Sequence, residues 1–132
     1  MAVQENPLIL TLLGTGHSTG IPQPGNVWGA CDPANPRNKR RRASLLAQKG
    51  DTSLVVDTGP DFRLQSCAVA LKRIDAILYT HSHSDHITGI DDVRVYAFRQ
   101  DTVLPVYGIA ETLNEIGSRF NHLFSPDHPE IY

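Results

Sequence analysis

The chain has 132 residues, 40% of them hydrophobic, and a net charge of −2, which is an ordinary globular composition with enough length for one modest core. No apolar run approaches the roughly 18 residues of a membrane-spanning helix, and residues 1–6 lack the basic and apolar stretches of a signal peptide, so we expect a cytoplasmic protein with no membrane partner. Two cysteines are too few for a disulfide framework, and the low net charge does not favour a nucleic-acid partner.

The first part of the chain predicts strands joined by loops. Residues 8–13 form a short apolar run that predicts the first strand, and glycines follow it at a predicted turn. Four prolines in residues 22–42 prevent regular structure, so we expect a loop insertion there. Residues 43–48 and 53–56 flank Gly50, which suits a tight turn, and together they predict a β-hairpin.

The second part of the chain alternates helices with strands. The pattern predicts strands over residues 74–80 and 103–107, and helices over residues 60–71, 87–100 and 111–120. The buried side expected for the helix at 60–71 consists of Phe62, Cys67, Val69, Ala70 and Leu71. The buried side expected for the helix at 87–100 consists of Ile87, Ile90, Val93 or Arg94, and Ala97. Hairpins followed by alternating strands and helices fit an α/β layer with mixed strand pairing.

Three histidines and a carboxylate follow the strand predicted at 74–80, in the run His81-Ser82-His83-Ser84-Asp85-His86. Imidazole and carboxylate are ligands of catalytic Zn²⁺ and Mn²⁺. His81 and His83 are two positions apart, so in an extended segment both rings point the same way and can hold one ion. Asp85 and His86 come after the chain turns and can bind the same ion or a second one. A histidine-rich surface loop is the alternative, which the density of the cluster disfavours.

This hexapeptide resembles the HxHxDH signature of the metallo-β-lactamase superfamily. Four further segments, residues 12–22, 28–44, 57–63 and 104–108, resemble the phosphodiesterase branch of that superfamily. Within it the chain is similar to phosphoribosyl cyclic phosphodiesterases and, more distantly, to ribonuclease Z. The resemblance implies an α/β fold of the αββα sandwich type. Residues 1–132 would form the N-terminal part of one such domain, about its first βα half, with residues 22–42 as a loop insertion.

The resemblance also implies an enzyme, a metal-dependent phosphodiesterase acting on a small cyclic phosphate or nucleotide-like ester. Two divalent ions, Zn or Mn, would be held by His81 and His83 and by Asp85 and His86, and a hydroxide on the metals would attack phosphorus in line. Asp85 and His86 would act at the reaction centre, Asp85 also positioning the water. Alternatives are thiolester, lactone or β-lactam hydrolysis, or a metal-binding fragment that is inactive alone because family members take their remaining ligands from the second half.

Five further residues are candidates for supporting roles. The resemblance implies that Asp57 orients the metal loop through hydrogen bonds, and its alternative role is a helix N-cap. Thr15, His17 and Ser18 belong to a glycine-rich turn that can cradle a phosphate, although a simple turn is equally compatible with them. Arg40 lies in a basic run that would attract an anionic ester, the alternative being a solvated surface.

The remaining residues of interest carry weaker expectations. Cys31 stands alone where some relatives have a zinc-binding cysteine cluster, so we predict no structural zinc in the insertion. We expect His122 and His128 to be surface histidines and Trp28 to pin its loop. Because the first half of an αββα sandwich has a sheet face that the second half covers, we expect a homo-oligomer or association with a C-terminal half.

Overall fold

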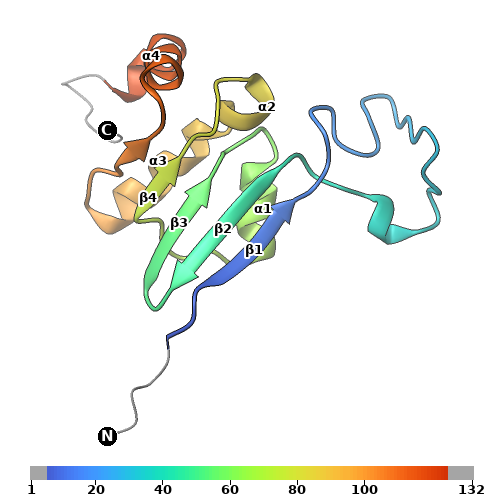
Figure 1. Cartoon of the computed structure of the whole chain (residues 1–132), viewed down its shortest axis with the longest axis horizontal. Coiled ribbons are helices and arrows are strands. Elements are labelled where there is room, and N and C mark those ends of the chain that lie inside the picture. The colour runs from blue at the N-terminus through green and yellow to red at the C-terminus, as the bar shows by residue number, and fades with distance from the viewer. Residues whose placement is uncertain (1–5, 125–132) are drawn as a thin grey trace, which may run out of the picture.

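The computed structural model describes residues 6–124, which form a five-stranded sheet with helices packed on one face (Figure 1). The strands are β1 (Ile9–Gly14), β2 (Ser44–Lys49), β3 (Thr52–Val56), β4 (Ala76–Leu78) and β5 (Val106–Tyr107), which lie in this order across the sheet. The first three strands pair antiparallel, whereas β3, β4 and β5 pair parallel. The predicted α/β class with mixed pairing is confirmed, and the hairpin turns at Gly50 as expected.

Four α-helices and two short 3-10 turns accompany the sheet. They are α1 (Phe62–Ala68), α2 (Ser84–Ile87), α3 (Ile90–Gln100), α4 (Ala110–Arg119), η1 (Pro36–Asn38) and η2 (Asn121–Leu123). The longest, α3, has 11 residues, and within residues 6–124 no helix combines the length and apolar character that crossing a bilayer requires. The strands predicted at 74–80 and 103–107 are shorter than expected. Only Ala76–Leu78 and Val106–Tyr107 pair with a neighbouring strand.

The continuous helix predicted from residue 87 to 100 is wrong, because the chain breaks between α2 and α3 at Gly89. The amide of Gly89 donates to the carbonyl of Thr58 at 2.8 Å. A Cβ at Gly89 would lie 2.1 Å from the carbonyl oxygen of Gly59, so this contact admits only glycine. The predicted apolar stripe is nevertheless confirmed, since Ile87, Ile90, Val93 and Ala97 are all buried.

The buried side predicted for α1 is wrong in part. Phe62 and Leu71 are buried, whereas Cys67, Val69 and Ala70 are exposed. The residues that α1 buries are Phe62, Gln65 and Ser66. Burial of Gln65 is compensated by a hydrogen bond from its side-chain nitrogen to the carbonyl of Arg42 at 2.8 Å. The helix ends at Ala68, and Ala70, with φ 50°, turns the chain so that Leu71 enters the core.

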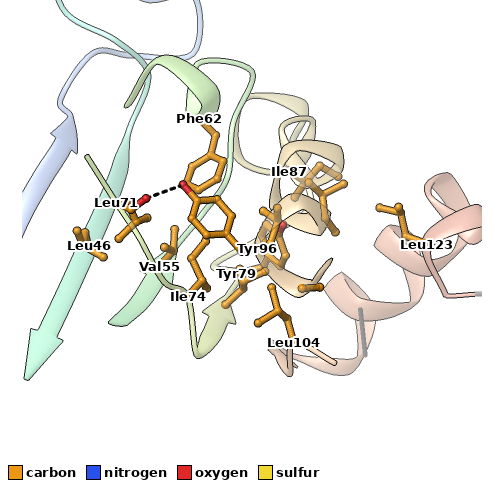
Figure 2. Close-up of a cluster of buried hydrophobic side chains, with 14 of the residues drawn as sticks. Leu46, Val55, Phe62, Leu71, Ile74, Tyr79, Ile87, Tyr96, Leu104 and Leu123 are labelled. Carbon is orange, nitrogen blue, oxygen red and sulfur yellow. Dashed lines mark hydrogen bonds between the residues drawn. The ribbon is translucent and has the colours of Figure 1, made fainter. Parts of the chain in front are cut away.

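The core lies between the sheet and the helices (Figure 2). Val55 and Ile77 from the sheet pack there with Phe62 of α1 and Tyr96 of α3, whose rings are 6.4 Å apart. Tyr96 donates its hydroxyl to the carbonyl of Leu71 at 3.4 Å, the dashed line in Figure 2. The buried hydrophobic residues of this layer come from β1 to β4, from the four α-helices and from the connecting loops.

The opposite face of the sheet is apolar and exposed, and we call it the open sheet face. Its side chains lie in register across the strands, in the order Leu12, Leu45, Val56, Leu78 and Tyr107. Leu12 is 69% exposed and Tyr107 is 55% exposed. Within residues 6–124 no helix covers these side chains, which agrees with the uncovered sheet face that the sequence predicts for a half sandwich.

The insertion leaves the sheet at the end of β1 and returns at the start of β2 (Figure 1). Residues 22–42 contain no α-helix or extended strand, only η1 and isolated bridges, as the prolines predict. Bridges between Gly16 and Arg42 and between Ile21 and Arg40 join the two sides of the insertion at its base.

Candidate metal centre

The histidine-rich loop lies at the end of β4, directly beside the end of β3. Because these strands are parallel, the residues that follow them meet at the same edge of the sheet, where ligand sites of α/β folds form. The backbone amide of Asp57, just after β3, donates to the carbonyl of Leu78 at 2.9 Å. The loop then continues into α2, which carries Asp85 and His86.

The three imidazoles of the loop are close together. The ring centre of His81 is 4.6 Å from that of His83 and 4.0 Å from that of His86. His83 is exposed, whereas His81, Asp85 and His86 are partly buried. Within the part of the chain that the structure describes, no three His, Cys, Asp or Glu side chains are arranged to hold an ion as they stand. The side-chain types fit a divalent metal, but in the described residues they do not form a complete coordination shell.

Asp57 connects the loop to the sheet through its buried carboxylate. One oxygen accepts from the amide of Thr80 at 2.8 Å, and the other accepts from the hydroxyl of Thr80 at 2.7 Å. The second oxygen is also 2.7 Å from Nδ1 of His86. The supporting contacts predicted for Asp57 are therefore present. Its alternative role as a helix N-cap is not, because α1 begins at Phe62 with Asp61 in the cap position.

The contact with Asp57 determines which nitrogen of His86 is free. A carboxylate only accepts, so Nδ1 of His86 carries a hydrogen, and in the neutral ring Nε2 keeps its lone pair. Nε2 lies 3.2 Å from a carboxylate oxygen of Asp85. Two lone pairs at that distance repel each other unless a cation or a proton lies between them, which is the chemistry of a pair of metal ligands.

The backbone of Asp57 is itself unusual. Its φ is 59°, in the left-handed region that a non-glycine residue adopts at a cost. Such conformations persist where the surrounding contacts fix them, and they are concentrated at functional sites. Here the fixing contacts are the three hydrogen bonds of the carboxylate.

The turn that follows Asp57 holds the loop by backbone contacts alone. The amide of Thr58 donates to the carbonyl of His86 at 2.8 Å. A Cβ at Gly59 would lie 2.0 Å from the carbonyl oxygen of Asp85, so glycine permits the approach. Behind the loop, the Thr58 hydroxyl is hydrogen-bonded to the hydroxyl of Tyr79, and burial raises the pKa of that phenol, which stays neutral.

Two residues of the site are not predicted by the sequence patterns. Thr80 directly precedes the loop, and its hydroxyl donates to Asp57 and lies 3.0 Å from Nδ1 of His81. Arg119, at the end of α4, donates to the carbonyl of Ser82 at 3.3 Å and pairs with Glu115 at 2.7 Å. No local pattern points to Arg119, because its contact depends on how α4 packs.

The residues predicted to contact substrate do not all line one groove. Thr15 and Arg40 line a separate groove of about 950 Å³, whereas His17 and Ser18 do not line it. Nδ1 of His17 accepts from the hydroxyl of Thr19 at 3.0 Å, and the carbonyl of Ser18 accepts from Arg42 at 2.8 Å. None of His81, His83, Asp85 and His86 lines this groove.

The other singled-out residues lie on the surface. His122 is 2.9 Å from a carboxylate oxygen of Asp91, and both are about half exposed. Trp28 donates to the side chain of Asn26 at 3.1 Å, which fits the predicted pinning of its loop. Cys31 and Cys67 are both free thiols, as expected. His128 lies outside the described residues.

A mixed sheet with helices on one face and a histidine-rich loop at the strand ends is the arrangement expected of a metal-dependent hydrolase. The chain belongs to the β-lactamase superfamily, because residues 52–131 match the family model described as the beta-lactamase superfamily domain. The resemblance seen in the HxHxDH sequence is therefore confirmed, and so is the fold class.

The chain is also similar to individual proteins and to solved structures. The chain is 36% identical over 114 residues to an octanoyltransferase of Porphyromonas gingivalis, covering 86% of this chain and 23% of that protein. It is 32% identical over 85 residues to the ribonuclease Z of Bradyrhizobium sp., covering 61% of this chain and 28% of the other. The crystal structure of a diphosphatase from the PhnP family matches with a TM-score of 0.84 and 35% identity, over 96% of this chain and 49% of that one. The chain thus spans less than half of each relative.

Proposed function

We propose that this chain provides the HxHxDH half of a metal-dependent hydrolase, and more specifically of a phosphodiesterase that acts on a small cyclic phosphate or nucleotide-like ester. The observation that carries the proposal is the contact of Asp57 with His86, which leaves Nε2 of His86 facing the carboxylate of Asp85. The relatives named as a diphosphatase and as ribonuclease Z support phosphorus chemistry.

The residues present fit a pair of divalent ions, Zn or Mn, in donor chemistry. His81 and His83 would hold one ion, and Asp85 and His86 the other. Bound metal would supply an activated water near neutral pH and positive charge for the phosphoryl oxygens. The chain's own contribution is positional. Asp57 fixes the ring of His86, and Asp85 would accept a proton from the attacking water or hold it in place.

The proposal also includes a partner that covers the open sheet face. A second copy of the chain, or a C-terminal half like that of the longer relatives, would cover the face and bring further ligands to the loop. The chain alone is therefore expected to bind metal weakly and to turn over no phosphodiester. A cytoplasmic location agrees with the free thiols Cys31 and Cys67 and is part of the proposal.

The first test is metal content, measured by mass spectrometry on chelator-free protein whose intact mass is determined on the same sample. We expect zinc or manganese to bind to the wild type and to be lost in His83→Ala. The matched control is His122→Ala, which removes a histidine outside the loop and should leave metal binding unchanged. Equal metal content in the His83→Ala variant would contradict the proposed ligand set.

The second test is substrate class. The wild type is assayed on bis(4-nitrophenyl) phosphate and on a thiolester, alone and in its assembled form, with zinc or manganese present. We expect metal-dependent phosphodiester hydrolysis by the assembly only. Preference for the thiolester would favour the alternative hydrolase class. Turnover by the monomer would show that the loop needs no second half.

A further inference from the structure

The insertion forms a groove that the proposed function does not use. This basic groove, of about 950 Å³, lies between residues 12–24 and residues 36–42. The charged residues that line it are Arg37, Lys39, Arg40, Arg41, Arg42 and Asp61. Five cations thus face a single carboxylate in a chain whose overall net charge is −2.

The single carboxylate of the groove, that of Asp61, is already paired with Arg42. Asp61 pairs with the guanidinium of Arg42 at 3.0 Å and also accepts from the backbone amide of Arg42 at 2.8 Å. Arg41 donates to the carbonyl of Leu64 at 2.9 Å, which orients it without neutralising its charge. Among residues 6–124, neither Arg37 nor Arg40 has a carboxylate within ion-pair distance. The groove therefore keeps an excess of positive charge.

The walls of the groove are fixed by backbone hydrogen bonds. The amide of Gly16 donates to the carbonyl of Arg41 at 2.7 Å. Ile21 and Arg40 exchange two backbone hydrogen bonds, at 2.9 Å and 2.8 Å. Since these contacts involve only the main chain of Arg40, its guanidinium is free to reach a ligand. The cations thus project from a rigid frame, which limits the entropy lost on binding.

Part of the lining is apolar. The apolar residues that line it are Leu12, Leu13, Ile21, Pro22, Pro24, Pro36 and Leu64. A site for inorganic phosphate alone would not need such a wall, whereas a base and a ribose would pack against it. The volume lies at the upper end of the roughly 300–1,000 Å³ typical of small-molecule sites, enough for a nucleotide.

We propose that the basic groove binds a nucleoside diphosphate, with its phosphates on Arg37, Lys39 and Arg40 and its base against the proline-rich wall. Arginine suits this role because its planar fork can engage two phosphate oxygens. The site goes beyond the proposed function, because none of the metal-loop residues lines it and binding would need no metal.

The test is a calorimetric titration of the full chain with ADP in excess chelator, which separates this site from the metal loop. We expect ADP to bind more tightly than AMP, inorganic pyrophosphate or adenosine, and its affinity to fall as salt is added. The double variant Arg37→Gln/Arg40→Gln should weaken ADP binding by about tenfold or more, as expected from the loss of two charge-assisted hydrogen bonds.

The matched control is Arg94→Gln/Arg99→Gln, which removes the same charge from exposed positions on α3 and should leave ADP binding unchanged. Equal weakening in this control would reduce the effect to overall charge and overturn the proposal. No binding of ADP at low salt would overturn it, as would equal affinity for AMP or binding of an RNA oligonucleotide in place of ADP. Unfolding curves of both variants check that they fold, which is expected because neither Arg37 nor Arg40 makes a side-chain hydrogen bond to another of residues 6–124.

Discussion

At the scale of single residues, Asp57 combines three properties that rarely occur together. It is 5% exposed, it adopts a left-handed backbone conformation, and its carboxylate accepts from Thr80 while contacting His86. Burial of a carboxylate and a strained φ are both unfavourable, and the hydrogen bonds offset them. The contacts of Asp57 thus act on the loop through Thr80 and His86.

Replacement of Asp57 by Asn tests this role. The amide group can donate to Nδ1 of His86, so the ring hydrogen should move to Nε2 and block the lone pair that faces Asp85. We expect the tautomer change in ¹⁵N NMR spectra of metal-free protein and a loss of zinc affinity of about 10–100-fold in competition with a chelator.

Asp91→Asn is the matched control, since Asp91 also faces a histidine, His122, at 2.9 Å but outside the loop. Its zinc affinity should equal that of the wild type. If Asp57→Asn keeps both the tautomer and the affinity, Asp57 does not set the state of His86.

At the scale of elements, the position of the metal loop depends on two glycines that allow backbones to touch. Gly59 meets the carbonyl of Asp85, and Gly89 meets the carbonyl of Gly59. The turn after β3, the loop after β4 and the break between α2 and α3 are therefore packed as one unit. Besides the hydrogen bonds of the Asp57 carboxylate, this geometry therefore depends on the absence of a Cβ at the two glycines.

Gly59→Ala should therefore move the loop. Its Cβ would lie 2.0 Å from the carbonyl oxygen of Asp85, and relief of this clash should cost about 1–3 kcal/mol of stability and weaken zinc binding. Chemical denaturation and zinc titration measure the two effects. Gly117→Ala is the control, because a Cβ at this position in α4 meets nothing, and alanine should stabilise the helix by roughly 0.5–1 kcal/mol. Equal behaviour of the two variants would show that the contact at Gly59 is unimportant.

A second element-scale prediction concerns pH. Asp75, just before β4, accepts from Arg73 at 2.6 Å and from the amide of Ser53 at 2.8 Å. The hydrogen bond from Arg73 lowers the pKa of Asp75, against the smaller opposing effect of burial. A carboxyl group whose pKa is lower in the folded state stabilises the fold above its unfolded pKa, and this contribution is lost as the pH falls through the folded pKa.

Asp75→Asn should accordingly destabilise the protein at neutral pH and have progressively less effect as the pH falls below about 4. Urea unfolding of both proteins across this range measures the difference. A destabilisation that does not change with pH would indicate that the charge of Asp75 contributes nothing.

The same scale shows how far sequence reasoning reaches. Hydrophobic periodicity predicted the hairpin and the stripe from Ile87 to Ala97, because each depends on neighbours in the chain. The break at Gly89 and the buried side of α1 depend on contacts with distant segments, Thr58 and Arg42, which periodicity does not contain. In the site, the HxHxDH residues form a local motif, whereas Arg119 reaches Ser82 across 37 positions of sequence.

At the scale of the whole molecule, the open sheet face is the dominant feature. Leu10, Leu12, Leu78 and Tyr107 are all substantially exposed on one side of the sheet, and the helices cover the other. A contiguous apolar surface of this kind marks an interaction site. The partner we propose is a second copy or a C-terminal half, which would complete the family's sandwich.

The double variant Leu12→Glu/Leu78→Glu should weaken this association. In sedimentation experiments we expect the wild type to self-associate with increasing concentration and the variant to remain monomeric, with little change in its unfolding midpoint. Val95→Glu is the control, because Val95 is also exposed, at 41%, but lies on α3. A monomeric wild type would exclude a second copy as the partner, and association of the double variant would exclude the open sheet face.

The bridges at the base of the insertion have a consequence for how the chain can be divided. Gly16 forms a parallel bridge with Arg42 and Ile21 an antiparallel bridge with Arg40, while β1 and β2 pair antiparallel in the adjoining sheet. A cut at the far end of the insertion would thus leave two pieces that stay joined by these bridges and by the pairing of β1 with β2. The chain could be expressed as two complementary polypeptides whose reassembly restores the fold.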